Sequence, residues 1–197
     1  MRPRDKTTAI LVDGSNLYAA NKTLGLTVDY RKLLHYFGGH VLRAGYFTAL
    51  PPESETSSLR PMVDYLEYNG WSVYQKLTRE FIDPVTGQKK VKGNMDVEIS
   101  VIAMELAPYI TNLVLFTGDG DFRFLVEAMQ RRHAVYVTVV STIVSRPPMI
   151  ADILRRQADQ FIDLVDIQGD IKRTTPTPVD ELHDPKIIKR FRFSNGG

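Results

Sequence analysis

Short apolar runs alternate with longer helical patterns along most of this chain. Five runs rich in valine, leucine, tyrosine and phenylalanine are typical of strands: residues 7–13, 40–49, 71–77, 113–117 and 134–140. Apolar residues at spacings of three and four predict helices over residues 29–37, 56–70, 95–106, 121–132 and 148–159. Several strands are apolar on both faces, so both faces must be covered. The sequence therefore predicts an α/β fold in which a central, mainly parallel sheet lies between two helical layers.

The size and composition of the chain fit one domain of this kind. The 197 residues are 43% hydrophobic, which is enough to bury a sizeable core. Because the composition changes near the end, we expect a domain over residues 1–166 and a tail or docking segment over 167–197. The absence of cysteine excludes disulfides and thiolate metal sites and fits a reducing compartment. No segment approaches the roughly 18 apolar residues of a membrane span, so we expect a soluble, cytoplasmic protein with no membrane partner.

Acidic residues follow two of the predicted strands at their carboxyl ends. Asp13 ends the first strand, and Asp119 and Asp121 lie in the segment GDGD after the fourth. Asp96 lies in the first turn of the helix that leads into that fourth strand. Ligands of parallel sheets bind beyond the carboxyl ends of the strands, so the four acids converge if the two strands are neighbours. Converging carboxylates need a compensating cation, and their oxygens suit a hard divalent ion such as Mg²⁺.

Each acid also has a purely structural explanation. Asp121 could cap the helix that follows it, Asp13 could belong to a turn, and Asp96 could complement a helix dipole. The glycines on either side of Asp119 would allow the backbone to approach a ligand closely. Asp119 itself has no capping role that Asp121 does not already fill. The joint arrangement therefore favours a metal site over four separate structural roles.

Three segments of the chain match known motifs in order and in spacing. They are ILVDGSNL at residues 10–17, KGNMDVEIS at 92–100 and LFTGDGDFRFLV at 115–126. Together they resemble the NYN domain family of LabA-like proteins, within the PIN-like nuclease superfamily, over roughly residues 7–165. The resemblance implies a PIN-like, Rossmann-like three-layer fold and an RNA-cleaving site that depends on Mg²⁺ or Mn²⁺.

The same resemblance assigns roles to individual residues. It implies an acidic catalytic and metal-binding cluster, which consists of Asp13, Asp96, Asp119 and Asp121. We expect Asp13 and Asp119 to be direct ligands, and Asp96 and Asp121 to act directly or through water. Asn16 follows the first acid, and Thr117 stands where the family often has serine. Both are expected to hold a water molecule or a phosphate oxygen. The implied reaction is metal-assisted hydrolysis of phosphodiester bonds.

Basic residues precede Asp96 and are the expected contacts for RNA. A net charge of +2 is too small to indicate a polyanion partner, so the positions of the charges must carry this expectation. The cations flanking the turn DPVTG are Lys76, Arg79, Lys89, Lys90 and Lys92. They predict a basic hairpin beside the site, although lysines on a hairpin can also serve only to prevent edge pairing. The family commonly carries a lysine at the position of Lys92, which we expect to contact the scissile phosphate.

A second basic segment, KIIKRFRF at residues 186–193, interleaves cations with two phenylalanines. It is suited to RNA backbone contacts and base stacking, and equally to a strand that docks on its own domain or across a homodimer. Two other functions compete with a nuclease. A haloacid-dehalogenase-type phosphatase needs a nucleophilic aspartate where this chain has Leu11, which excludes that chemistry. A catalytically silent NYN module that binds RNA or protein partners in regulation remains the alternative.

Overall fold

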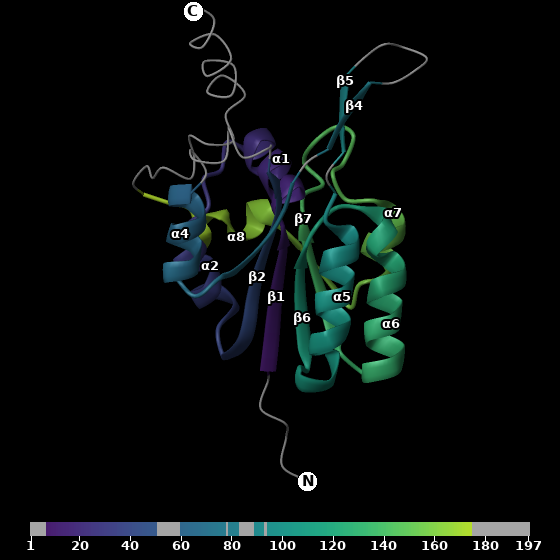
Figure 1. The fold of residues 1–197 in the computed structure, drawn as a ribbon. Coiled ribbons are helices and arrows are strands. Elements are labelled where there is room, and N and C mark those ends of the chain that lie inside the picture. The colour runs from purple at the N-terminus through teal and green to yellow at the C-terminus, as the bar shows by residue number, and fades with distance from the viewer. Residues whose placement is uncertain (1–6, 51–59, 78, 83–88, 93, 175–197) are drawn as a thin grey trace, which may run out of the picture.

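The computed structural model describes residues 7–50, 60–77, 79–82, 89–92 and 94–174 (Figure 1). The strands of its main sheet are β1 (Thr7–Asp13), β2 (His40–Leu50), β3 (Ser72–Leu77), β6 (Asn112–Phe116), β7 (Tyr136–Ser141) and β8 (Gln160–Asp163). They form one sheet in the order β3-β2-β1-β6-β7-β8, and each neighbouring pair is parallel. The predicted α/β class with a central parallel sheet is confirmed.

Helices cover both faces of this sheet (Figure 1). They are α1 (Gly14–Leu24), α2 (Tyr30–Phe37), α4 (Arg60–Tyr68), α5 (Asp96–Leu106), α6 (Arg123–His133), α7 (Asp152–Gln157) and α8 (Leu164–Ile171). Buried residues of α1, α2, α4 and α8 form one core, and those of α5, α6 and α7 form the other. Along β1, Ile10 and Val12 contact the first core while Ala9 and Leu11 contact the second. This period of two explains why β1 is apolar throughout, since both of its faces are buried.

The chain leaves the two central strands, β1 and β6, toward opposite sides of the sheet. This arrangement determines where a ligand site can lie. From β1 the chain continues outward through β2 and β3, whereas from β6 it continues in the other direction through β7 and β8. β1 and β6 pair in parallel with Val12 opposite Phe116, so Asp13 and Thr117 leave the sheet side by side. Open α/β sheets bind ligands at such a switch point, outside the carboxyl ends of the strands. The expectation that the strands before Asp13 and Asp119 are neighbours is therefore confirmed.

The predicted basic hairpin is present as a separate two-stranded ribbon. Its strands, β4 (Arg79–Ile82) and β5 (Lys89–Lys92), are antiparallel, with Arg79 opposite Lys92. The ribbon projects from the edge of the molecule at which the strands of the main sheet end (Figure 1). Lys76 belongs to β3 of the main sheet instead.

One helix was missed between the first two predicted strands. α1 begins directly after β1, and its buried residues are few: Gly14, Leu17 and Ala20. The apolar pattern of α1 is therefore weak, and its start is fixed by the Asp13 cap, which looks like a turn from sequence alone. The helix expected over residues 56–70 appears as α4, and residues 56–59 lie outside the described part.

The segment after β7 differs most from expectation. A helix was predicted over residues 148–159, but α7 begins only at Asp152 and a short strand, β8, follows it. α8 then crosses the expected domain boundary at residue 166, and its Ile167 and Ile171 are buried in the core. The packed domain therefore extends past that boundary. Among the described helices, none is long and apolar enough to cross a membrane.

Candidate metal centre

Three carboxylates meet beyond the switch point between β1 and β6. Asp96 lies in the first turn of α5, Asp119 follows β6, and Asp121 lies in the short 3-10 helix η2 (Gly120–Phe122) that leads into α6. One oxygen of each lies within 4.8 Å of the others. Asp96 and Asp119 are partly buried, whereas Asp121 is exposed. This set of hard oxygen donors, open to solvent on one side, fits Mg²⁺ or Mn²⁺.

The electrostatics of Asp96 show that these carboxylates repel one another. Burial raises the pKa of Asp96 above its ordinary value, and the charges of Asp119, Asp13 and Asp121 raise it further. A hydrogen bond from Asn94 Nδ2 to Asp96 Oδ2, at 2.7 Å, partly opposes this rise. A raised carboxyl pKa means that the ionised form is disfavoured, and a bound divalent cation would reverse that preference.

Asp119 caps η2, a role that the sequence assigned to Asp121. The Asp119 carboxylate accepts a hydrogen bond from the backbone N–H of Asp121 at 2.9 Å. The backbone N–H of Asp119 in turn donates to Thr117 Oγ1 at 3.2 Å. Thr117 is only 1% exposed, so its hydroxyl shapes the turn from inside. The expectation that Asp121 would fill any capping role here, leaving none for Asp119, was wrong. One oxygen of the Asp119 carboxylate is held in place by the backbone.

Asp13 is near the three carboxylates but is held by its own helix. Its side chain caps α1 and accepts hydrogen bonds from the backbone N–H groups of Ser15 and Asn16, from Ser15 Oγ at 2.7 Å and from Asn16 Nδ2 at 2.6 Å. It is 4% exposed and does not belong to the group of three. Burial raises the pKa of Tyr46 to about 12, and the charge of Asp13 adds to this rise against a hydrogen bond with Tyr30. Asp13 therefore combines the structural role of a cap with an electrostatic influence on the site.

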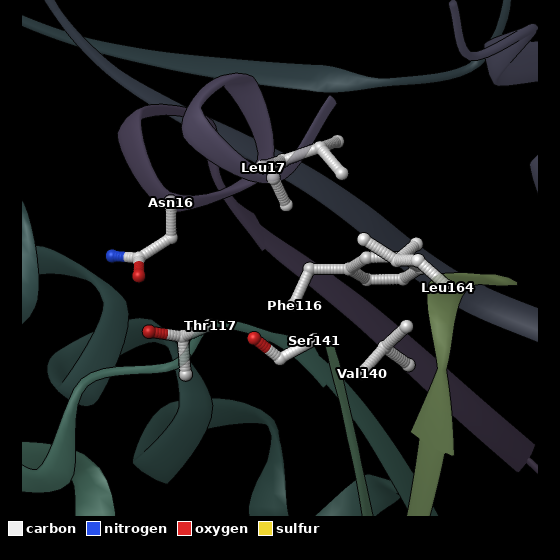
Figure 2. Close-up of a pocket in the computed structure, with 8 residues that line it drawn as sticks. Asn16, Leu17, Phe116, Thr117, Val140, Ser141 and Leu164 are labelled. Carbon is white, nitrogen blue, oxygen red and sulfur yellow. The ribbon is translucent and has the colours of Figure 1, made fainter. Parts of the chain in front are cut away.

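Asn16 joins the two central strands at their carboxyl ends. Its Nδ2 donates to Asp13 Oδ2, and its Oδ1 accepts from the backbone N–H of Gly118 at 3.1 Å. Figure 2 shows the Asn16 amide oxygen and the Ser141 hydroxyl both turned toward Thr117. Together with five apolar residues these three residues line a small cavity of about 10 Å³, which is close to the space that one water molecule needs. The apolar residues are Leu17, Ala20, Phe116, Val140 and Leu164. Asn16 thus acts first as a link between two loops.

Packing against the chain itself requires glycine at residue 118 of the GDGD segment and leaves little room at residue 120. A Cβ on Gly118 would lie 2.0 Å from the carbonyl oxygen of Met149, and one on Gly120 would lie 3.2 Å from Ala151 and Ile153. The backbone N–H of Ala151 also donates to the Gly118 carbonyl at 2.9 Å. The close approach expected for a ligand is therefore made by residues 149–153. This packing fixes the position of Asp119, which lies between the two glycines.

An ion pair borders the site and was not predicted. Lys76 on β3 meets Glu98, two residues after Asp96 on α5, with an Nζ–Oε1 distance of 2.7 Å. The pKa of Glu98 is lowered chiefly by this hydrogen bond. Spacing in the sequence offers no signal for the pair, because a strand and a helix 22 residues apart supply it. Arg79, Lys90 and Lys92 lie on the hairpin, and their side chains fall outside the described part.

Known proteins match most of this chain in sequence and in fold. The chain is 32% identical over 176 residues to the Low amplitude and bright protein LabA of Synechococcus elongatus, covering 87% of this chain and 90% of that protein. A crystal structure of a protein of unknown function from Vibrio parahaemolyticus superimposes with a TM-score of 0.67 at 28% identity, covering 88% of this chain and 100% of the other. The family model named NYN domain matches residues 7–166. Because that match spans most of the chain, the protein belongs to the NYN domain family.

Proposed function

We propose that this protein is a metal-dependent endoribonuclease that hydrolyses phosphodiester bonds of RNA. The observation that carries the proposal is the group of three carboxylates, Asp96, Asp119 and Asp121, with ligand oxygens within 4.8 Å of one another at the switch point of the sheet. Membership of the NYN domain family and similarity to LabA support a nuclease-like role connected with RNA.

The donor set fits a divalent ion. Three carboxylate oxygens within reach of one another provide hard ligands, and the raised pKa of Asp96 reflects a local excess of negative charge. Asp96, Asp119 and Asp121 would hold Mg²⁺ or Mn²⁺, with Asp13 adding negative charge from the end of β1. Such an ion, when bound, lowers the pKa of a water molecule and neutralises charge on the leaving oxygen.

The chain itself supplies position and orientation. Asn94 orients Asp96, and the backbone of Asp121 orients Asp119, so both carboxylates are placed before any ligand arrives. Asn16 and Thr117 hold the loops from which these acids project. Arg79, Lys90 and Lys92 lie on the hairpin at the same edge of the molecule, where they would contact the RNA backbone.

Cleavage of labelled single-stranded and structured RNAs by purified protein tests this function, with Mg²⁺, Mn²⁺ or EDTA present. Asp119→Asn is the informative variant, because an amide oxygen can still accept the Asp121 hydrogen bond while the charge is lost. The matched control is Asp64→Asn on α4, which removes a carboxylate paired with Arg60 at the surface on the other face of the sheet. We expect metal-dependent cleavage by the wild type and Asp64→Asn, and a loss of orders of magnitude in Asp119→Asn.

Two results would count against the proposal. Equal cleavage by Asp119→Asn and the wild type would show that the activity does not come from this site. Tight RNA binding by the wild type without cleavage under any metal condition would favour the alternative of a silent NYN module that binds RNA in regulation.

A further inference from the structure

The first turn of α6 presents an exposed aromatic ring directly after the acidic residues. Phe124 is 70% exposed, although it lies two residues after the buried Phe122 and three after Asp121. Side chains of a helix lean toward its N-terminus, so the ring covers the turn that carries Asp121. The guanidinium of Arg123 lies 5.1 Å from the centroid of this ring. An exposed aromatic ring with a cation beside it therefore opens the helix that follows Asp121.

Two further exposed apolar side chains belong to segments next to the acidic residues. Val97 follows Asp96 on α5 and is 68% exposed. Ile153 on α7 is 50% exposed and lies against Gly120, since a Cβ on that glycine would be 3.2 Å from Ile153 Cγ2. Single exposed apolar residues are common on protein surfaces. Here three such residues belong to the elements that carry the acids or pack against the loop between them, which supports a binding surface at this end of the sheet.

We propose that Phe124 stacks on a nucleobase of the strand whose phosphate lies at the acidic cluster, with Ile153 packing beside that base. The inference rests on the proposed function and adds the residue that positions the substrate. Every base has a flat face, so stacking on an aromatic side chain requires no particular sequence. Arg123, whose guanidinium also lies 3.9 Å from the Glu127 carboxylate, adds positive charge beside the ring.

The same geometry defines the form of the substrate. The faces of bases are covered by their neighbours in a duplex and become available only in single strands, loops and bulges. A site that seats a base on Phe124 beside the reacting phosphate therefore acts on unpaired nucleotides. Cleavage next to an unpaired base follows from the position of the ring relative to Asp121.

The experiment combines protein variants with an RNA that lacks one base. Binding of a short fluorescein-labelled single-stranded RNA is measured by anisotropy with Ca²⁺ in place of Mg²⁺, for the intact RNA and for a set with one abasic position moved along the strand. The variants are Phe124→Leu, which removes the ring, and Phe124→Tyr, which keeps it. The matched control is Tyr109→Leu, because Tyr109 is similarly exposed, at 71%. It precedes β6, so it lies at the amino ends of the strands, opposite the end that carries the acids.

We expect Phe124→Leu to weaken binding of intact RNA by about 5- to 100-fold, as the loss of one stacked base should. Phe124→Tyr and Tyr109→Leu should bind like the wild type. One abasic position should weaken binding by the wild type but add nothing to the loss in Phe124→Leu, because ring and base form a single contact. Melting temperatures close to that of the wild type would show that the variants remain folded.

Each other outcome decides between this inference and the proposed function. An abasic cost that is equal in the wild type and in Phe124→Leu overturns the stacking inference, and unchanged cleavage of intact RNA would leave the nuclease proposal standing. Coupling between Phe124 and one base without any cleavage in Mg²⁺ or Mn²⁺ supports the base site and contradicts the nuclease. A wild type that binds no RNA overturns both.

Discussion

Asn16 is the residue that ties the two halves of the site together. Replacing it with alanine removes the hydrogen bonds to Asp13 and from the Gly118 amide, and leaves both partners without that contact. We expect Asn16→Ala to lower the free energy of unfolding by about 1–3 kcal/mol, the usual cost of leaving such partners unpaired. Urea unfolding monitored by circular dichroism measures this change.

Ser15→Ala is the matched control for Asn16→Ala. Its hydroxyl also donates to Asp13, but it makes no link to the loop after β6. The expected loss is smaller, about 1 kcal/mol or less for one partly buried bond. A loss in Ser15→Ala equal to or larger than that in Asn16→Ala would show that the link between β1 and β6 does not matter to stability.

Asp96 gives the metal-free protein a defined pH dependence. Its pKa is raised in the folded state, so between the unfolded pKa of about 4 and the higher folded value the folded state binds more protons. The free energy of unfolding therefore loses a contribution from Asp96 as pH rises through this window. In EDTA we expect Asp96→Asn to become more stable than the wild type as pH rises above about 4, by about 1 kcal/mol or less because the group is partly exposed to solvent.

Urea unfolding at a series of pH values in EDTA tests this dependence, with Asp64→Asn as the control for removing an acid elsewhere. A difference between Asp96→Asn and the wild type that stays constant across the pH range would show that folding does not raise the pKa of Asp96.

The loop after β6 and the segment before α7 form one packed unit, and two glycines test it. Gly118→Ala would force a Cβ to within 2.0 Å of the Met149 carbonyl oxygen, so the segment that donates from Ala151 must move away. We expect a loss of about 2–4 kcal/mol in the free energy of unfolding, since backbone rather than a flexible side chain is displaced.

Gly169→Ala provides the opposite case. Gly169 lies inside α8, and an alanine methyl there would meet no other part of the described chain within 4 Å, so alanine should stabilise the helix by about 0.5–1 kcal/mol. Thermal melts of both variants measure the contrast. Similar stabilities for the two alanine variants would mean that the contact between Gly118 and Met149 is not tight in solution.

The elements predicted correctly from sequence are those with strong local patterns. β1, β6 and β7 are largely apolar on both faces, and α5 and α6 carry apolar residues at helical spacing. The pattern of apolar residues alone therefore identifies these elements. The start of α7 could not be predicted, because Met149 and Ala151 are held by backbone bonds to Thr142 and Gly118. β8 has four residues and only its last one is buried, so its sequence shows little of the apolar pattern that identifies a strand.

The position of the acidic site could also be predicted from local sequence patterns, whereas the roles of its residues depend on contacts between distant segments. The two motifs that carry Asp96 and the pair Asp119 and Asp121 were sufficient to find the three acids that the fold brings together. The individual roles of these acids were harder to predict from sequence. A carboxylate that caps a helix and one that binds a metal can both come directly after a strand. The four hydrogen bonds to Asp13 arise from a helix that the sequence pattern barely indicates.

The whole domain includes α8, which extends beyond the residues matched by the family model. Ile167 and Ile171 are buried in the core, and Arg173 donates to Tyr65 at 2.9 Å. A chain ending at residue 166 loses these contacts, and each buried isoleucine alone contributes about 1.5–3 kcal/mol. We expect residues 1–174 to melt cooperatively and residues 1–166 to melt at a much lower temperature or not to fold.

Circular dichroism melts of the two truncated chains and the full chain make this comparison. Equal melting of the chains ending at 166 and 174 would show that α8 is not part of the folding unit. The chain ending at 174 also tests the predicted docking of residues 186–193, which lie outside the described part. That docking requires the full chain to differ from it in stability or in mass by light scattering.

Metal binding should be visible in the stability of the whole molecule. An ion that binds only the folded state adds about 2.7 kcal/mol when its concentration is 100 times the dissociation constant. We therefore expect Mg²⁺ or Mn²⁺ to raise the melting temperature of the wild type and of Asp64→Asn, and to leave Asp119→Asn nearly unchanged. Identical metal responses in the wild type and Asp119→Asn would remove Asp119 from the set of ligands.

The peptide groups of Gly118 are held from both sides, by Asn16 on α1 and by Ala151 before α7. Its amide hydrogen should therefore exchange slowly with deuterium even when no ion is bound, because exchange requires the loop to open. Asp119 follows this residue directly, so the loop that carries it is already ordered before an ion or a strand arrives. Binding of a metal ion or of an RNA strand to the protein should then proceed in one kinetic phase, without a slow step of loop rearrangement.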